Sequence, residues 1–147
     1  MQKKKLLISA CLIGIPCRYD GQSKPLDIDI SALSERYELI PVCPEIYGGL
    51  PTPRTPSERV GDRVIMKDNT DVTDNYKRGA EATLALAKKL GATHALLKAK
   101  SPSCGKYSVY DGSFRGILRE GQGVTAELLS ECGIDVYDES EISLLLD

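Results

Sequence analysis

The stretch that decides the fold is Lys5-Leu6-Leu7-Ile8-Ser9-Ala10, a short apolar run that ends directly before Cys11. It is too short for the core of a signal peptide, which needs roughly 7–15 apolar residues. It is also far shorter than the ~20 apolar residues of a membrane span. A brief continuous apolar run with polar flanks is typical of a buried strand. We therefore expect residues 5–10 to form a buried strand.

Three further segments have the length and composition of strands, and they lie at residues 38–42, 94–98 and 134–137. Pro41 cannot donate a backbone hydrogen bond, so it favours a bulge or an edge position for the first of these segments. Residues 63–66 are predicted to form a shorter strand or one arm of a hairpin.

Helical patterns alternate with these strands. Residues 73–90 repeat apolar side chains with a period of 3.6, which predicts a helix that ends at Gly91. Shorter helices are predicted after Asp29, over residues 122–131, and after Asp138, where Glu141 completes a capping box. Strands that alternate with helices favour a parallel sheet. We therefore expect an α/β fold: one domain over residues 1–147, a three-layer sandwich with a mainly parallel, Rossmann-like sheet.

Length and composition limit the possible partners. The chain has 147 residues, with 19 basic and 21 acidic side chains and a net charge of −2. This balance provides no strong basic field to hold a nucleic-acid backbone, so a small molecule is expected rather than a long RNA or DNA. No segment is apolar enough for a membrane span, and we expect a cytoplasmic location. The sequence does not determine the oligomeric state.

Three of the five cysteines follow predicted strands: Cys11, Cys43 and Cys104. The carboxyl ends of parallel strands meet at one edge of a sheet, where ligands bind in folds of this class. Soft thiolates select zinc, copper(I) or iron–sulfur clusters, and three thiolates leave one metal position open for catalysis. The alternative is that these cysteines are small apolar residues that fill the ends of the strands.

The other two cysteines and the single histidine are also candidates for metal or redox chemistry, and we expect a different role for each. Cys132 falls on the apolar face of a predicted helix and is expected in the core. Cys17 precedes Arg18, so it is either structural, a spare ligand or a redox partner. His94, the only histidine, lies in a strand pattern and is expected to be partly buried and structural.

Glu45 is the best candidate for an acid or base, because it lies two residues after Cys43 on the same loop, unless it is a surface or loop-capping carboxylate. Ser101 and Ser103 can donate hydrogen bonds or relay protons beside Cys104, unless they serve only the turn around Pro102. Three cations, Arg18, Arg54 and Lys100, can hold an anion such as the phosphate of a nucleotide, or they are solvated surface charges.

Several ordered motifs extend over almost the whole chain. They are Ser9-Ala10-Cys11-Leu12, Cys17-Arg18-Tyr19-Asp20-Gly21, Val42-Cys43-Pro44-Glu45, Gly48-Gly49-Leu50-Pro51-Thr52-Pro53-Arg54, Ser101-Pro102-Ser103-Cys104-Gly105, Tyr110-Asp111-Gly112 and Gly121-Gln122-Gly123-Val124-Thr125. Through these motifs the chain resembles the family long catalogued as domain of unknown function 523, now associated with thiouracil desulfidases.

The resemblance implies a specific cofactor and reaction. It implies a [4Fe–4S] cluster on Cys11, Cys43 and Cys104, whose fourth iron has no cysteine ligand and can take the sulfur of the substrate. It assigns the acid/base glutamate to Glu45 and an active-site serine to Ser101. The implied reaction is non-redox and converts a thiouracil to uracil and sulfide. The implied substrate is a small thiolated base or nucleotide.

Three alternative functions remain open at the level of sequence. The chain can be a non-catalytic iron–sulfur protein that senses redox state or iron. It can be a hydrolase with a zinc ion on the same cysteines. It can also be a transferase that uses Cys17 as a nucleophile.

Overall fold

The computed structural model describes residues 3–26 and 30–147. Its central feature is a four-stranded sheet in the order β2-β1-β5-β8, and every neighbouring pair of strands is parallel. The strands are β1 (Lys4–Ser9), β2 (Tyr37–Val42), β5 (His94–Leu96) and β8 (Asp135–Tyr137). The predicted α/β fold with a parallel sheet is confirmed. Pro41 lies in β2 at the edge of this sheet, as its missing N–H group requires.

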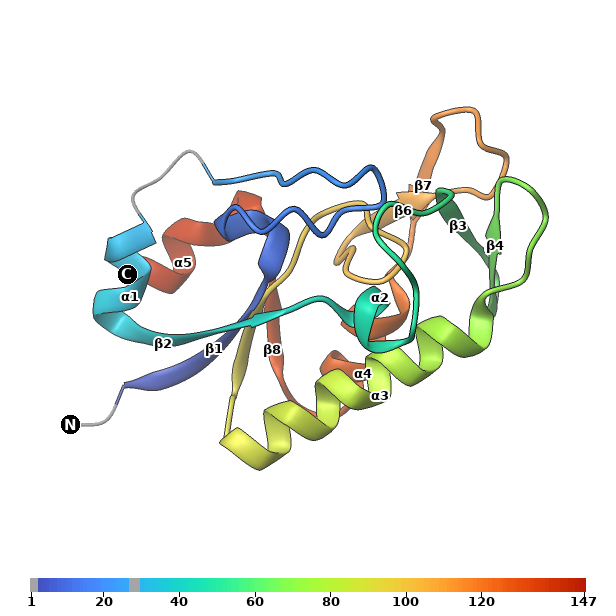
Figure 1. Cartoon of the computed structure of the whole chain (residues 1–147). Helices are drawn as coiled ribbons and strands as arrows, with labels where there is room; N and C mark the ends of the chain where they lie inside the picture. The colour runs from blue at the N-terminus through green and yellow to red at the C-terminus, as the bar shows by residue number, and fades with distance from the viewer. Residues whose placement is uncertain (1–2, 27–29) are drawn as a thin grey trace.

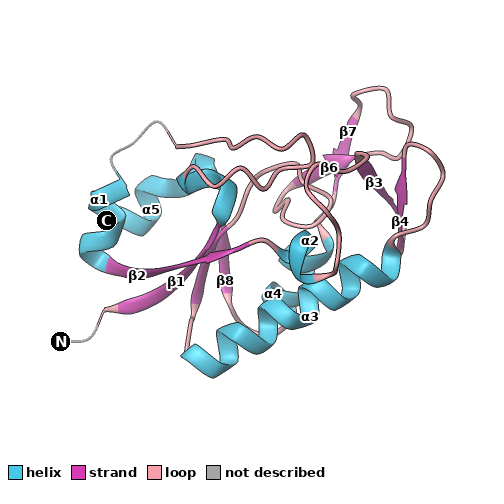
Figure 2. Cartoon of the chain, viewed as in Figure 1, coloured by secondary structure: helices cyan, strands magenta, loops and turns pink. Residues whose placement is uncertain are grey.

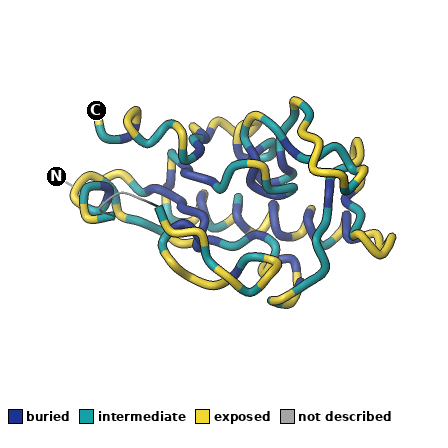
Figure 3. The backbone as a smooth tube through the Cα atoms, turned by 90° about the horizontal axis from the view of Figure 1, so that it is seen from above, coloured by how far each residue is buried: buried dark blue, intermediate teal, exposed yellow. Residues whose placement is uncertain are grey.

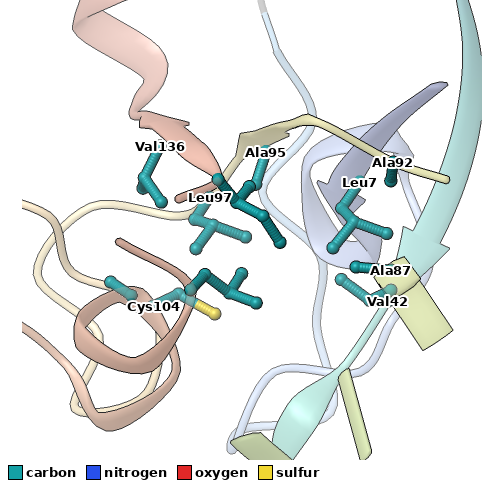
Figure 4. Packing of buried hydrophobic residues seen from close by; sticks show 11 residues of the cluster. Leu7, Val42, Ala87, Ala92, Ala95, Leu97, Cys104 and Val136 are labelled. Carbon is teal, nitrogen blue, oxygen red and sulfur yellow. The ribbon is translucent and has the colours of Figure 1, made fainter. Parts of the chain in front are cut away.

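Helices cover both faces of the sheet (Figure 1). On one face, Leu7, Ala95 and Val136 pack against α3 (Thr73–Leu90) and α4 (Val124–Glu131). Figure 4 shows Leu7 of β1 and Val42 of β2 beside Ala87 of α3 in this cluster, with Cys104 at its margin. On the other face, a second cluster joins the sheet to α1 (Ile30–Arg36) and α5 (Ile142–Leu146). Alternate residues of β1 therefore point to opposite hydrophobic clusters. Buried segments of the chain, in dark blue, lie in the middle of the molecule, with exposed segments around them (Figure 3).

The long helix α3 agrees with the prediction at both ends. Its buried face includes Tyr76, Ala80 and Ala87, which recur with the helical period. Gly91 follows the helix with a φ of 75°, and its N–H group bonds to the carbonyls of Ala87 and Lys88. This left-handed cap is a conformation that glycine adopts without steric cost.

Two antiparallel hairpins complete the fold (Figure 2). The first consists of β3 (Ser57–Val60) and β4 (Arg63–Met66), and the second of β6 (Ser108–Tyr110) and β7 (Leu118–Glu120). The predicted hairpin arm at residues 63–66 is confirmed. The other three short strands were not predicted, because three or four residues of mixed polarity show no usable period.

Some details differ from the sequence-based expectations. The short helices η1 (Ala10–Ile13), a 3-10 helix, and α2 (Pro44–Tyr47) were not predicted. The predicted capping box is confirmed: Asp138 accepts from the Ser140 N–H group and Glu141 bonds back to Asp138, at the start of the 3-10 helix η2 (Glu139–Glu141). The predicted cap at Asp29 lies outside the described residues.

The prediction for Cys132 is wrong. This residue caps the carboxyl end of α4, after the apolar face has ended, and its side chain is exposed. The last residue in a helical pattern has no next turn to pack against, so periodicity overestimates burial there. None of the helices in the described part of the chain is both long and apolar enough to cross a membrane.

Candidate active site

A cavity of about 540 Å³ lies where the carboxyl ends of the sheet strands meet the two hairpins. Four cysteines line it: Cys11, Cys17, Cys43 and Cys104. Strand order reverses beside β1, because the chain passes from β1 to β2 on one side and returns to β5 on the other. Such a reversal leaves a crevice beyond the strand ends, which is the usual ligand site in open α/β sheets.

Each predicted ligand cysteine follows a different strand. Cys11 lies in η1 after β1, Cys43 immediately follows β2 and caps the amino end of α2, and Cys104 lies in the loop after β5. The Cys43 thiol approaches the backbone carbonyl of Cys17 at 3.8 Å. Three thiols from distant parts of the chain thus share one cavity. The fourth thiol in the cavity is that of Cys17, for which the sequence allowed several roles. All five cysteines are free thiols.

The Cys104 loop is fixed by its own hydrogen bonds. The Ser101 hydroxyl oxygen accepts from the backbone N–H groups of Ser103 and Cys104, both at 3.1 Å. A hydroxyl has one donor and two acceptor positions, so the Ser101 proton remains available for donation. Since Ser101 lines the cavity, it can donate to a bound ligand.

Helix α4 supports the same loop from behind. The Thr125 N–H group bonds to the Ser103 carbonyl at 2.8 Å, and the Val124 N–H group bonds to the Pro102 carbonyl at 2.9 Å. A Cβ atom at Gly123 would lie 2.4 Å from the Ser103 backbone, so only glycine allows this close approach. The helix start therefore fixes the position of Cys104.

The surroundings raise the pKa of three cavity thiols, those of Cys17, Cys43 and Cys104. The hydrogen bond that the Cys43 thiol donates to Cys17 raises the pKa of Cys43 above its usual range, and burial adds to the effect. Burial raises the pKa of Cys104 to about 12, and the charge of Glu45 adds to the shift. A hydrogen bond to Cys11 raises the pKa of Cys17, with burial in the same direction. A bound metal inverts this balance, because coordination deprotonates a thiol.

Glu45, the predicted acid or base, lies in α2 beside the cavity. Its Oε2 atom accepts from Arg54 Nη2 at 2.8 Å, from Arg54 Nε at 3.2 Å and from the Tyr76 hydroxyl at 3.1 Å. Within residues 3–26 and 30–147, no hydrogen bond is made to Oε1 of Glu45. One carboxylate oxygen is therefore anchored, and the other is available for proton transfer.

Tyr76 reaches Glu45 because helices α2 and α3 approach each other unusually closely. A Cβ atom at Gly79 would lie 1.9 Å from the Pro44 carbonyl oxygen, and one at Gly48 would lie 2.0 Å from the Asn75 carbonyl oxygen. Burial raises the pKa of Tyr76 well above its usual range, and the charge of Glu45 acts in the same direction. The phenol therefore remains a proton donor to the carboxylate.

The predicted anion-binding residues differ in position. Arg18 and Lys100 line the cavity, and Arg18 lies 4.0 Å from Asp20. Lys100 is exposed and has a φ of 68°, a left-handed conformation that is strained for a residue with a Cβ atom. Arg54 also lines the cavity, but its guanidinium group is directed at Glu45. Ser103 lies behind the wall, where its hydroxyl pairs with Thr125 at 2.8 Å.

Several cavity residues were not singled out from the sequence. Tyr76 lies on the buried face of α3, and the helical period of residues 73–90 gives no signal of its hydroxyl partner. Lys67 follows β4, and Tyr110 and Phe114 belong to the second hairpin and its loop. The Tyr110-Asp111-Gly112 motif was the one available signal that this segment has a role.

Comparison with known proteins identifies the family. A family model for 2-thiouracil desulfurase matches residues 6–141. The chain belongs to the 2-thiouracil desulfurase family. The resemblance inferred from the motifs is thereby confirmed.

Two similar proteins cover nearly the full length of the chain. The first is a solved structure of the [4Fe–4S]-dependent thiouracil desulfidase TudS (DUF523Vcz), which is 45% identical, with a TM-score of 0.94. The alignment covers 97% of this chain and 95% of that one. The second is the Bacillus subtilis (strain 168) protein described as uncharacterized protein YbbK, which is 39% identical over 151 residues, covering 96% of this chain and 99% of YbbK.

The donor set of the cavity fits an iron–sulfur cluster. In the described part of the chain, no three His, Cys, Asp or Glu side chains are grouped to hold a metal ion. The cysteine ligands of a cluster bind separate irons, so they line a cavity rather than converge on one point. Soft thiols that line a preformed cavity at rigid strand ends suit such a group.

Proposed function

We propose that this chain is a [4Fe–4S]-dependent desulfidase that hydrolyses the carbon–sulfur bond of a thiouracil, with Cys11, Cys43 and Cys104 as the cluster ligands. The observation that carries the proposal is one cavity lined by these three thiols and by Glu45, whose Oε1 atom has no hydrogen bond in the described structure. The family match and the near-complete similarity to TudS support it.

The proposed reaction balances without an oxidant or a reductant. Thiouracil and water give uracil and hydrogen sulfide, as a C=S bond is replaced by a C=O bond. A bound cluster supplies a Lewis-acidic iron with an affinity for sulfur at the position that no cysteine occupies.

The protein groups carry the proton transfers. The free Oε1 atom of Glu45 takes a proton from the attacking water, while Arg54 and Tyr76 hold Oε2. The Ser101 hydroxyl donates to the substrate as negative charge develops, because backbone N–H groups already occupy its acceptor positions. These two groups therefore have complementary roles, one accepting and one donating.

The substrate is proposed to be a thiolated base or nucleotide. Arg18, Lys24, Lys67 and Lys100 line the cavity and give it a positive rim that favours an anionic or electron-rich ligand. Aromatic side chains, Tyr110 and Phe114, offer surfaces against which a planar ring can pack.

Three broader predictions from the sequence belong to the same proposal. We infer a cytoplasmic location, which suits a chain whose cysteines are all free thiols. We infer that residues 1–147 form a single domain. We also infer a Rossmann-like relationship for the sheet, because its strand order reverses beside β1.

The test is anaerobic reconstitution of the cluster followed by incubation with 2-thiouracil and 4-thiouracil. The proposal predicts uracil and sulfide in equal amounts, with no consumption of a reductant. A chain that binds about four irons but releases no sulfide from any thiolated base or nucleotide would instead fit a sensor of iron or redox state. A chain that binds one zinc ion and no sulfide would fit the hydrolase alternative.

A further inference from the structure

We propose that Arg54 is a positioning residue that holds Glu45 in its reactive orientation and does not bind the substrate. The inference rests on the proposed function, because it concerns the base of that reaction. It reassigns a cation that the sequence suggested as an anion-binding group.

The hydrogen bonds of Arg54 leave no donor for a ligand. A guanidinium group carries five N–H donors. Arg54 Nε bonds to Glu45 Oε2 at 3.2 Å, and Nη2 bonds to the same oxygen at 2.8 Å and to the Cys17 carbonyl at 3.2 Å. Nη1 bonds to the Pro51 carbonyl at 3.2 Å and to the Thr52 hydroxyl at 3.1 Å. All five donors therefore have protein acceptors.

Burial makes this arrangement rigid and costly to change. The Arg54 side chain is 3% exposed and that of Glu45 is 14% exposed. A substrate anion would have to displace a carboxylate or a backbone carbonyl that would then remain buried and unpaired. Burial lowers the pKa of Arg54, but the charge and hydrogen bond of Glu45, with smaller contributions from Tyr76 and Cys43, raise it above its usual range, so the guanidinium group stays ionised.

The geometry gives Arg54 a second role as a link between segments. It connects the Cys17 loop, helix α2 with Glu45, and the Pro51–Thr52 segment. Tyr76 of α3 adds a third bond to Glu45 Oε2. With Oε2 held from three directions, rotation of the carboxylate is restricted and Oε1 remains the atom that can accept a proton. Lysine cannot replace this function, because a single ammonium group lacks the planar fork of donors.

The experiment measures kcat and KM for thiouracil in the reconstituted full-length protein. The variants are Arg54→Lys and Tyr76→Phe, each alone and combined with Glu45→Gln, and iron is counted in every preparation. Arg59→Lys is the matched control, because Arg59 is a partly buried arginine paired with Glu127 at 2.7 Å outside the cavity wall. Tyr76→Phe removes one hydroxyl group and preserves the ring, so it remains informative if Arg54→Lys fails to fold.

We expect kcat to fall by about 10–100-fold in Arg54→Lys and by about 3–10-fold in Tyr76→Phe, with KM changed less than about threefold. In the Glu45→Gln background, neither change should lower kcat further, because the base that they position is already absent. The control should keep native kcat, and all variants should bind iron as the native protein does.

Other outcomes separate the possible failures. A rise in KM at constant kcat would make Arg54 a substrate-binding residue and overturn the inference. An equal loss of kcat with and without Glu45, or a loss of iron, would make its role merely structural and also overturn it. If the native protein carries a full cluster and releases no sulfide, the proposed function fails, which is a different result from either of these.

Discussion

The two ends of the parallel sheet differ in whether their polar groups face packed side chains or a cavity. At the amino end of β5, His94 lies between the rings of Tyr37 and Tyr137, with centroids 6.0 and 6.2 Å away. Its Nδ1 atom lies 2.7 Å from the Thr93 hydroxyl, and its Nε2 atom lies 3.9 Å from Asp135. The predicted structural role of this partly buried histidine agrees with these contacts.

The carboxyl ends present the opposite arrangement. There, two groups that line the cavity are each anchored at one atom and open at another: Glu45 is open at Oε1, and Ser101 at its hydroxyl proton. Polar groups that are fully paired stabilise a fold, whereas groups held at one atom and open at another are prepared for a ligand. The comparison teaches that a ligand site in this sheet is indicated by anchored groups whose open atoms line a cavity, rather than by the presence of a titratable side chain.

The largest expected effect is at the three proposed cluster ligands. Cys11→Ser, Cys43→Ser and Cys104→Ser should each reduce bound iron and lower desulfidation to background, because serine is a hard ligand that binds iron–sulfur groups poorly. Iron analysis and sulfide release measure this.

Cys132→Ser is the matched control for the ligand variants, since Cys132 is exposed at the end of α4. It should bind iron and react as the native protein does. Full iron content in any of the three ligand variants would break the assignment of that cysteine.

Replacement of the proposed base has the next largest expected effect. Glu45→Gln preserves the shape of the side chain and removes its negative charge, so kcat should fall about 10²–10⁴-fold while iron content stays native. Steady-state kinetics on reconstituted protein provide the measurement. Native kcat in this variant would show that proton transfer occurs elsewhere in the cavity.

Ser101→Ala should have a somewhat smaller effect on kcat, about 10²-fold, because it removes one hydrogen-bond donor to the developing charge. It also leaves the N–H groups of Ser103 and Cys104 without their acceptor, which should cost about 1–2 kcal/mol of stability. Kinetics and thermal unfolding measure the two effects. A variant that loses stability but retains kcat would limit Ser101 to supporting the Cys104 loop.

The smallest effect on activity is expected at the opposite end of the sheet. His94→Gln should change kcat by less than about twofold, while the lost ring contacts and the altered hydrogen bond should cost about 0.5–1.5 kcal/mol of stability. Parallel kinetic and denaturation assays test this. A large fall in kcat for His94→Gln at native stability would show that the amino end of the sheet also contributes to the reaction, which would contradict the comparison.

The sequence predicted the features that depend on neighbouring residues, such as a helical period, a helix cap or the residue that follows a strand. Helix α3 was predictable because 18 residues repeat one period and Gly91 provides a left-handed cap. The position of Cys11, Cys43 and Cys104 at one edge followed from three parallel strands, each with a cysteine in the loop that follows it. In a parallel sheet, the loops that follow the strands lie at the same edge, even when they are far apart in the sequence.

The remaining features depend on long-range contacts that leave little trace in the sequence. Arg54 appeared as a cation available to an anion, and only the fold pairs it with Glu45 and Tyr76. The hairpin of β6 and β7 rests on three-residue strands that have no period of their own. Gly79 gave no signal, because its importance comes from the carbonyl of Pro44 on a different helix.

The most direct test of the central claim is the Mössbauer spectrum of protein reconstituted anaerobically with ⁵⁷Fe, recorded with and without thiouracil. Three cysteine ligands for four irons predict one iron site that differs from the rest, and only that site should change when thiouracil is added. Four equivalent irons that do not respond to thiouracil, or iron that is not present as a four-iron cluster, would contradict the account.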